Sequence, residues 1–263
     1  MTGTDRKEVT FVAASASHIG RVRSSNQDTV FSWVSAPSAQ PARGLLIVAD
    51  GLGGEQAGDV ASEKAVATVT ESLLPTLKEA PGESLAQLTA RLEELIREAN
   101  RRIYNYARRE LGPFANAGTT FTAALLCGLE VAIAHVGDSR AYLLAGSGLQ
   151  LLTRDHTRAQ ELVELGMLTP QEVHKNPRRN VLTRSVGTES EMQVNTQRHS
   201  VGAGDRLLLC SDGLWDMVHD PDELSAPART GEPQQAVQAL ITAANERGGE
   251  DNIGVVVCEV RRA

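Results

Sequence analysis

The alternation of hydrophobic and polar positions divides the chain into strands and helices that come in separate runs. Short apolar runs bounded by turn residues are typical of strands. The expected strands span residues 9–15, 29–34, 45–49, 119–127, 130–136, 141–144, 149–152, 206–211 and 253–260. The stretch from 119 to 152 has the pattern of a meander of antiparallel hairpins, because glycine-containing turns separate its strands.

Two long stretches have helical spacing. The first runs from about residue 57 to residue 74, and Pro75 is expected to end it. The second begins at Ser84 and Gln87, which are spaced as a capping box, and continues to the Gly-Pro pair at 112–113. Because both helices follow one strand, we expect them to cover one face of a sheet. Strands and helices in separate runs predict an α+β fold.

The segment 151–187 interrupts the strand pattern. It contains Thr169-Pro170-Gln171-Glu172, a capping box with proline at the first helical position, which predicts a small helical insertion. Loops of this kind often act as lids. A further amphipathic helix is expected at 234–247. The sequence has no internal repeat, so we expect a single domain over residues 1–263, with this insertion, called the flap below.

Composition narrows the class of protein. The chain has 263 residues, 41% hydrophobic and 22% charged, which is typical of a soluble globular protein. Its net charge of −7 argues against nonspecific nucleic-acid binding. Cys127, Cys210 and Cys258 are odd in number and far apart, which favours buried thiols over disulfides. No apolar run approaches the ~20 residues of a membrane span, and the N-terminus lacks the apolar core of a signal peptide. We therefore expect a cytoplasmic protein.

Four aspartates share one local setting. Each stands where a predicted strand meets a turn of small residues, and they are Asp50, Asp138, Asp212 and Asp251. If these strands belong to one sheet system, their ends can bring the carboxylates together. Two carboxylates 4 Å apart repel by about 4 kcal/mol at an effective dielectric constant of 20, so such a cluster needs cations or shared protons. Oxygen ligands favour Mg²⁺ or Mn²⁺ over zinc or copper. Taken singly, each aspartate could equally be a turn residue.

Seven short motifs follow one another along the chain. They are Arg23-Ser-Ser-Asn26-Gln-Asp28, Asp50-Gly51-Leu-Gly-Gly54, Gly118-Thr119-Thr120, Val136-Gly137-Asp138-Ser139-Arg140, Asp155-His156, Cys210-Ser211-Asp212-Gly213-Leu-Trp215 and Asp251-Asn252. In this order they resemble the metal-dependent type 2C (PPM-type) protein serine/threonine phosphatases, most closely the compact bacterial members. The resemblance spans roughly residues 9–260 and implies a β-sandwich of two antiparallel sheets flanked by helices.

The resemblance also implies a two-metal hydrolase and a role for each motif residue. Asp50 would bridge both metals, with the Gly51 carbonyl on the second. Asp212 and Asp251 would complete the first metal. Asp28 would act on the second metal through a water molecule. Asp138, together with Asp212, would hold a third, weaker metal, or would only cap its turn.

Arg23 would bind the substrate phosphate, where a guanidinium group suits two phosphate oxygens; the alternative is a surface or structural arginine. The resemblance implies that hydroxide bridging the two metals attacks phosphorus in line, without a phosphoenzyme. Animal members carry histidine two residues after the bridging aspartate, where this chain has Leu52. Because Leu52 cannot donate a proton, the leaving group must receive it from water or from elsewhere.

The histidines outside these motifs carry little signal. His135 alternates with apolar residues of a predicted strand, which favours a hydrogen-bonded structural histidine over a ligand. His156 follows Asp155 in the flap motif and is interpreted as a structural contact at the hinge of the flap rather than as a catalytic acid.

The sequence therefore predicts a bacterial, cytoplasmic phosphatase that acts on phosphoserine and phosphothreonine in proteins. Its cofactors would be two Mn²⁺ or Mg²⁺ ions, with room for a third. Its expected partners are phosphorylated proteins, including substrates of Ser/Thr kinases and the kinases themselves, and it is expected to be a monomer. Two alternatives remain: a regulatory phosphatase dedicated to one partner, and a catalytically silent phosphoprotein-binding module. The retention of Asp50, Asp212 and Asp251 weighs against the silent module.

Overall fold

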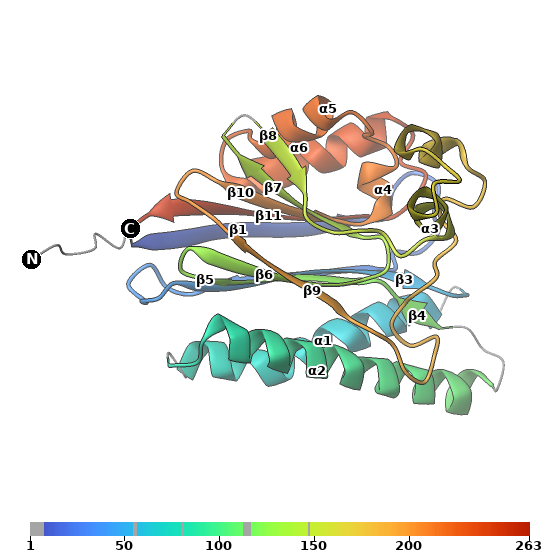
Figure 1. Ribbon diagram of the computed structural model, residues 1–263, viewed down its shortest axis with the longest axis horizontal. Helices are drawn as coiled ribbons and strands as arrows, with labels where there is room; N and C mark the ends of the chain where they lie inside the picture. The colour runs from blue at the N-terminus through green and yellow to red at the C-terminus, as the bar shows by residue number, and fades with distance from the viewer. Residues whose placement is uncertain (1–7, 55–56, 80–81, 113–116, 147) are drawn as a thin grey trace, which may run out of the picture.

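The computed structural model describes residues 8–54, 57–79, 82–112, 117–146 and 148–263. The expectations about the N-terminus and Pro113 concern residues outside these ranges. Two antiparallel sheets lie face to face (Figure 1). The first, in spatial order, contains β1 (Val9–His18), β11 (Ile253–Arg262), β10 (Arg206–Cys210), β7 (Arg140–Ala145) and β8 (Gly148–Leu151). The second contains β2 (Asp28–Val34), β3 (Arg43–Leu52), β5 (Phe121–Cys127), β6 (Glu130–Val136) and β9 (Asn195–Ser200), with β4 (Gly118–Thr119) paired to β3.

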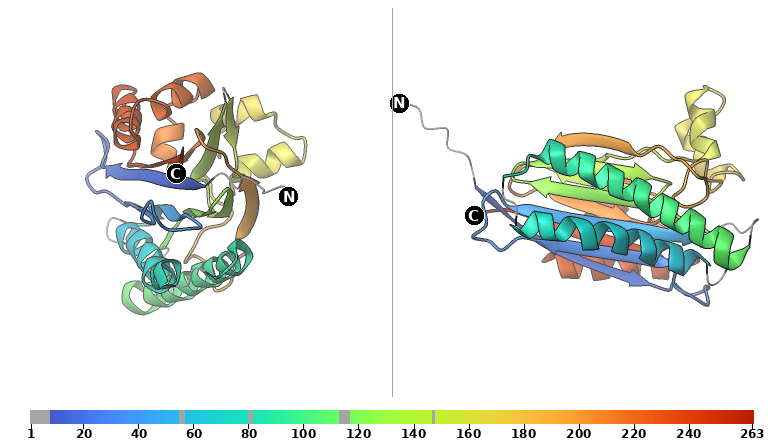
Figure 2. Two further views of the ribbon diagram at one scale, coloured as in Figure 1. Left: turned by 90° about the vertical axis from the view of Figure 1, so that its left-hand side faces the viewer. Right: turned by 90° about the horizontal axis from the view of Figure 1, so that it is seen from below.

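Helices cover the outer face of each sheet. The second sheet is covered by α1 (Ala57–Glu79) and by α2 (Leu85–Tyr106), which continues as the π-helix η1 (Ala107–Leu111). The first sheet carries α4 (Asp212–Trp215), α5 (Pro221–Ala228) and α6 (Pro233–Glu246). The flap, with α3 (Arg158–Glu164) and the 3₁₀-helix η2 (Pro170–Lys175), projects at one end of the sandwich (Figure 2). The predicted order of helix, sheet, sheet and helix is confirmed.

Strand β3 shows why this architecture suits the sequence. Leu45 and Ile47 face the core beneath α1 and α2, whereas Leu46 and Val48 face the core between the two sheets. A strand buried on both faces needs a continuous apolar run rather than an alternating one. A third apolar layer lies between the first sheet and α4 to α6. All three cysteines are free, as predicted, and Cys210 and Cys258 are buried, whereas Cys127 is only half-buried.

Two predictions about the elements were wrong. Pro75 does not end the first helix, because α1 continues to Glu79. Leu73 and Leu77 lie one turn apart on either side of Pro75 and are both buried in the core. Pro75 cannot donate to the carbonyl of Glu71, but Glu71 and Pro75 are both exposed residues, so water can reach that carbonyl. The meander expected over 119–152 is divided between the sheets, because β5 and β6 pair in the second sheet and β7 and β8 in the first.

Three elements have no counterpart among the predictions. β9 is an edge strand with mostly polar, exposed side chains, so it lacks the apolar signal of a strand. α4 is a single turn, and α5 is a short helix with a proline inside it. No helix in the described ranges is long and apolar enough to cross a membrane.

The fold brings the motifs to one end of the sandwich. Asp28 lies opposite Asp50 in the pairing of β2 with β3. Cys210 lies opposite Val255 in the pairing of β10 with β11, so Asp212 and Asp251 flank the same end of these two strands. The C-terminus lies at the other end of the sheets (Figure 1).

Candidate active site

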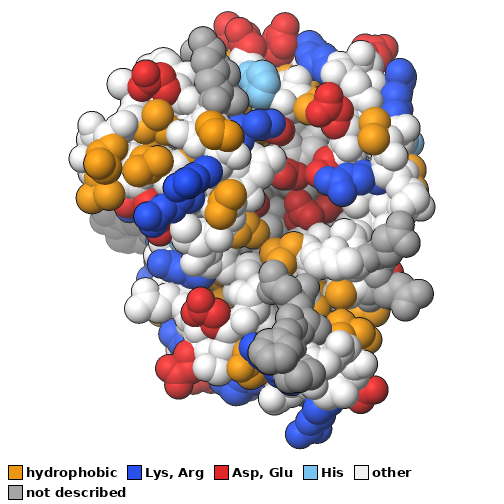
Figure 3. All heavy atoms as spheres, turned by 90° about the vertical axis from the view of Figure 1, so that its right-hand side faces the viewer, with side chains coloured by type: hydrophobic (Ala, Val, Ile, Leu, Met, Phe, Trp, Pro, Cys, Tyr) orange, Lys and Arg blue, Asp and Glu red, His pale blue; other side chains and the backbone are white. Residues whose placement is uncertain are grey.

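Acidic side chains gather in a hollow on the end of the sandwich that carries the flap (Figure 3). This hollow, the acidic cleft, has a volume of about 300 Å³. Six of the seven site residues predicted from the sequence line it, and they are Arg23, Asp50, Gly51, Asp138, Asp212 and Asp251. Leu52 lines it as well, whereas no histidine does among the described residues. The acidic cleft therefore unites motifs that are far apart in the sequence.

Backbone hydrogen bonds fix Asp50 at the end of β3. Its N–H donates to Thr120 Oγ1 over 2.9 Å, and its carbonyl accepts from the Thr120 N–H over 2.8 Å and from Thr119 Oγ1 over 2.9 Å. The next residue must be glycine, because a Cβ on Gly51 would lie 2.2 Å from the carbonyl oxygen of Gly58. The carboxylate is thus held rigidly beside bare backbone at the cleft wall.

Asp28 lies behind the cleft wall and is buried. Ser211 Oγ donates to Asp28 Oδ2 over 2.6 Å and itself accepts from the Gly254 N–H over 2.8 Å. Ser211 thereby links the carboxylate of Asp28 to the start of β11. It stands in one of the sequence motifs, but its positioning role depends on a contact between residues 183 positions apart, which no local pattern reveals.

Asn252 holds the loop that carries Arg23. Its side-chain NH₂ donates to the carbonyls of Ile19 and Ser25 over 2.9 and 2.8 Å, and its Oδ1 accepts from the Gln27 N–H over 2.8 Å. The Arg23 guanidinium forms an ion pair with Asp251, with 2.6 Å between Nη2 and Oδ2. Arg23 therefore lies at the mouth of the cleft and is paired with a predicted metal ligand.

Asp138 stands in the loop that passes from the second sheet to the first. Its backbone carbonyl accepts from Trp215 Nε1 over 3.0 Å, and its side chain is buried. The next residues lead into a compact group consisting of Arg140, Tyr142, Asp155 and Trp215, called the Arg140 cluster. Here Arg140 Nη2 lies 2.7 Å from Asp155 Oδ2, and its guanidinium carbon lies 3.7 Å from the centre of the Trp215 ring.

Burial and mutual repulsion raise the pKa values of carboxyl groups in and behind the cleft wall. Burial, followed by the charge of Asp212, raises the pKa of Asp28 to about 7, although the Ser211 hydrogen bond opposes this shift. Burial and the charge of Asp251 raise the pKa of Asp212 to about 6. The pKa values of Asp50 and Asp138 are raised well above the usual range, mainly by burial and then by neighbouring carboxylates. The cleft therefore concentrates negative charge at a substantial electrostatic cost.

The donor set fits a hard divalent cation. Asp28 Oδ1 and Asp212 Oδ1 are buried without a hydrogen-bond partner in the described part of the chain, and an oxygen in this state is stabilised by a cation. Within the same ranges, no three His, Cys, Asp or Glu side chains form a ready-made cage for a metal ion. Because like charges repel, we expect a bound cation to stabilise the arrangement of these carboxylates.

The flap is attached to the sandwich by buried histidines and by ion pairs. The His156 N–H donates to the Gly137 carbonyl over 2.7 Å, and the Gly137 N–H donates to His156 Nδ1 over 3.0 Å. His135 is hydrogen-bonded to Thr122 Oγ1 and to the Arg154 carbonyl. Both histidines are structural, as predicted. At the far side of the flap, Arg179 Nη2 lies 3.0 Å from Asp216 Oδ2.

Known proteins resemble this chain in sequence and in fold. The family model of protein phosphatase 2C matches residues 15–242. The chain is 39% identical to the serine/threonine phosphatase stp of Listeria monocytogenes, over 91% of this chain and 92% of that protein. The serine/threonine phosphatase PstP/Ppp of Mycobacterium tuberculosis has a TM-score of 0.82 at 36% identity, over 96% of this chain and 99% of that one. A structure of the PstP catalytic domain with two manganese ions has a TM-score of 0.80 at 35% identity, with the same coverage.

A sandwich of two sheets, covered by helices and ending in a carboxylate-lined cleft, defines a metal-dependent hydrolase. The family match and the relatives at more than 30% identity make the assignment specific. The chain belongs to the protein phosphatase 2C family, the metal-dependent serine/threonine protein phosphatases.

Proposed function

We propose that the acidic cleft is the two-metal catalytic centre of this phosphatase and that Asp50 is shared by both metals. In this proposal the Gly51 carbonyl serves the second metal, and Asp212 and Asp251 complete the first. Asp28 orients water on the second metal from behind the wall. The observation that carries the proposal is the convergence of Asp50, Asp138, Asp212 and Asp251 on one cleft. Asp28 lies behind its wall, and one buried oxygen each of Asp28 and Asp212 has no hydrogen-bond partner in the described part of the chain.

When bound, the two divalent cations supply positive charge that stabilises phosphoryl transfer and activates water as the nucleophile, without a phosphoenzyme. The contribution of the chain is to hold the carboxylates in place: Thr119 and Thr120 fix Asp50, and Ser211 fixes Asp28. Leu52 has no proton to give, and the buried histidines are occupied by structural hydrogen bonds. We therefore propose that the leaving group takes its proton from water in the cleft.

Arg23 is proposed to bind the substrate phosphate. Its guanidinium is 54% exposed and lies at the mouth of the cleft, so a phosphate can reach it. The ion pair with Asp251 must open for this purpose. A metal that neutralises Asp251 would weaken the pair and release Arg23 toward the substrate, so binding of metal and binding of phosphate would support each other.

Further features extend the proposal beyond the catalytic centre. We propose a single catalytic domain over residues 1–263 with the flap at 151–187, and a third, weaker ion at Asp138 and Asp212. The ion in the cell is Mn²⁺ or Mg²⁺, and the protein acts as a cytoplasmic monomer. Its substrates are proteins phosphorylated by Ser/Thr kinases, together with the kinases themselves.

The test is hydrolysis of p-nitrophenyl phosphate and of a phosphothreonine peptide, with Mn²⁺ or with EDTA. We expect activity with Mn²⁺ only, and Asp212→Asn to remove most of it. Asp222→Asn is the matched control, because Asp222 is exposed on α5, outside the cleft lining. Equal rates for the wild type with Mn²⁺ and with EDTA would refute the metal mechanism. Activity limited to one phosphoprotein would favour a dedicated regulatory phosphatase instead.

A further inference from the structure

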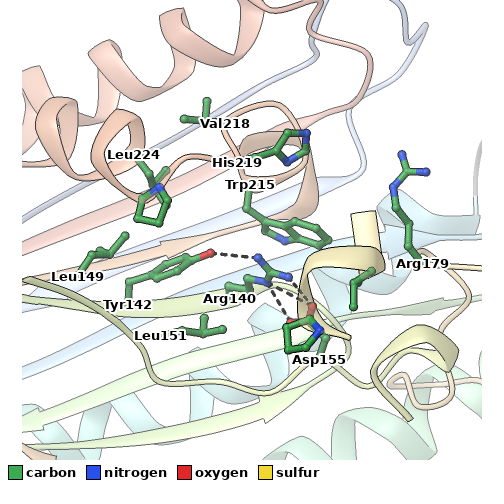
Figure 4. A pocket seen from close by; sticks show the side chains of 13 residues that line it. Arg140, Tyr142, Leu149, Leu151, Asp155, Arg179, Trp215, Val218, His219 and Leu224 are labelled. Atoms are coloured by element: carbon green, nitrogen blue, oxygen red, sulfur yellow. Dashed lines mark hydrogen bonds and ion pairs between the residues drawn. The ribbon is translucent and has the colours of Figure 1, made fainter. Parts of the chain in front are cut away.

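A second cavity, larger than the acidic cleft, lies between the flap and the first sheet. Its volume is about 410 Å³, within the range of roughly 300–1,000 Å³ that is typical of ligand pockets. We call it the apolar groove and define it by Leu149, Leu151, Val173, Trp215, Val218 and Leu224. Figure 4 shows these walls around the Arg140 cluster, with side chains contributed by β7, β8, α4 and α5.

The side chains of Arg140, Asp155 and Arg179, which line the groove, already have ion-pair partners. Arg140 is bound by both carboxylate oxygens of Asp155, donates to the hydroxyl of Tyr142 and stacks on Trp215. Arg179, on the flap side, is paired with Asp216. With these charges compensated, an additional charged group in the groove would lose hydration without gaining a counterion. The groove therefore suits an uncharged, apolar occupant.

The groove adjoins the region of the catalytic centre at Arg179. Arg179 lines the groove and also lines a smaller hollow whose walls include Asp212 and Asp251. The ion pair of Arg179 with Asp216 thus stands between the apolar groove and the metal-binding carboxylates. An extended peptide with its phosphorylated residue in the acidic cleft could place a nearby side chain beyond this ion pair.

We propose that the apolar groove binds a large apolar side chain of the phosphoprotein substrate, at a fixed distance along the chain from the phosphorylated residue. This inference rests on the proposed function and names a chemical preference for it. Wall residues from β8, α4 and α5 form the body of the site, and Val173 from the flap closes one side. The groove would thereby select among phosphoproteins that the acidic cleft alone cannot distinguish.

The test uses polar phosphothreonine peptides in which one leucine is moved one position at a time on either side of the phosphothreonine. At one spacing we expect kcat/KM to rise about tenfold over the peptide without leucine, mainly through a lower KM. Leu151→Lys should abolish this preference, because Leu151 is 43% exposed at the groove wall. It should leave hydrolysis of p-nitrophenyl phosphate unchanged.

Leu165→Lys is the matched control. It makes the same change at an exposed leucine after α3 of the flap that does not line the groove, so the preference should remain. The absence of any preferred spacing, or an equal loss in both variants, would overturn the proposal. If the wild type with Mn²⁺ does not hydrolyse p-nitrophenyl phosphate at all, the proposed function itself is refuted.

A binding measurement keeps the inference testable without catalysis. The chain has two tryptophans, Trp33 on β2 and Trp215 in the groove, so Trp33→Phe leaves Trp215 as the only reporter. The dephosphorylated peptides are added one at a time. The peptide with leucine at the preferred spacing should change the fluorescence of Trp215, and the peptide without leucine should not. Absence of this difference would overturn the proposal. So would a change that follows enzyme concentration without peptide, since the occupant would then be a second copy of the chain.

Discussion

The acidic cleft and the Arg140 cluster meet at Asp138, yet charge is compensated in the cluster and largely uncompensated in the cleft. In the Arg140 cluster, the guanidinium is matched by a carboxylate, a hydroxyl and an aromatic face. In the cleft and behind its wall, carboxylates repel one another, and one oxygen each of Asp28 and Asp212 is unpartnered in the described part of the chain. The comparison teaches that the cluster supports the fold by itself, whereas the cleft, in the function proposed above, needs cations to balance its charge.

The largest expected effect comes from removing a charge in the cleft. Asp50→Asn keeps the shape of the side chain but removes the charge of the proposed shared metal ligand, so phosphatase activity with Mn²⁺ should fall on the order of a thousandfold. In EDTA the same change should raise the free energy of unfolding, because one source of repulsion is lost. Activity assays and urea denaturation in EDTA measure the two effects. A variant that is inactive and also less stable in EDTA would contradict the view that the cleft is electrostatically strained.

The same substitution in the Arg140 cluster should have the opposite effect on stability. Asp155 is buried and forms a bidentate ion pair with Arg140, so Asp155→Asn leaves a largely buried guanidinium without its counterion. We expect the free energy of unfolding to fall by about 3 kcal/mol. Urea denaturation in EDTA, beside the Asp50→Asn protein, gives a direct comparison. If both variants shift in the same direction, the two regions do not differ as proposed.

The two buried histidines beneath the flap, His135 and His156, are expected to make the free energy of unfolding depend on pH. Burial lowers the pKa of His135 to about 4 and that of His156 to about 3, against 6.5 for the unperturbed group. Below pH 6.5 these two histidines therefore bind more protons in the unfolded chain than in the folded chain, so their contribution to stability falls as the pH falls from 6.5 towards these values. Asp28 and Asp212, whose pKa values are raised, contribute in the opposite direction. The contribution lost between pH 6.5 and about 5.5 is about 1 kcal/mol per histidine.

Urea denaturation across this pH range measures the effect. A double replacement, His135→Gln with His156→Gln, should remove the histidine contribution, which is measured as the difference between the pH profiles of the wild type and the variant, whatever the effect on stability at pH 7. If the wild type and the double variant change in stability in parallel between pH 6.5 and 5.5, these histidines are not held neutral by the fold.

The same contrast explains what the sequence can predict. Asp50 and Asp212 each follow an apolar strand and precede glycine, so their position at a strand end can be inferred locally. The bond from Ser211 to Asp28 and the clamp formed by Asn252 join segments that meet only in the folded chain. The apolar groove could not be predicted because its walls come from separate strands, helices and the flap.

The errors in predicting the fold from the sequence have similar physical origins. β9 forms because its backbone completes the edge of a sheet, although its side chains are polar. α1 passes through Pro75 because the packing of Leu73 and Leu77 outweighs the lost hydrogen bond. In both cases tertiary contacts override the local propensity, which a sequence pattern alone does not register.

The smallest expected effect concerns the contact between the two regions. Trp215 stacks on Arg140 and donates its indole N–H to the Asp138 carbonyl, so it links the Arg140 cluster to the proposed third metal site. Trp215→Phe keeps an aromatic ring but leaves that buried carbonyl without its donor. Because outer groups position the ligands of a metal, we expect the affinity for the weakest Mn²⁺ ion to fall about tenfold.

Calorimetric titration with Mn²⁺ measures this affinity independently of catalysis. Trp33→Phe is the matched control, since it makes the same change on β2, away from the residues that line the cleft. If Trp215→Phe weakens only the last ion to bind, the Arg140 cluster supports the cleft through Asp138 while the two tighter ions depend on the carboxylates themselves. If both variants bind all ions as the wild type does, the two regions are neighbours without coupling, and the indole hydrogen bond serves the fold alone.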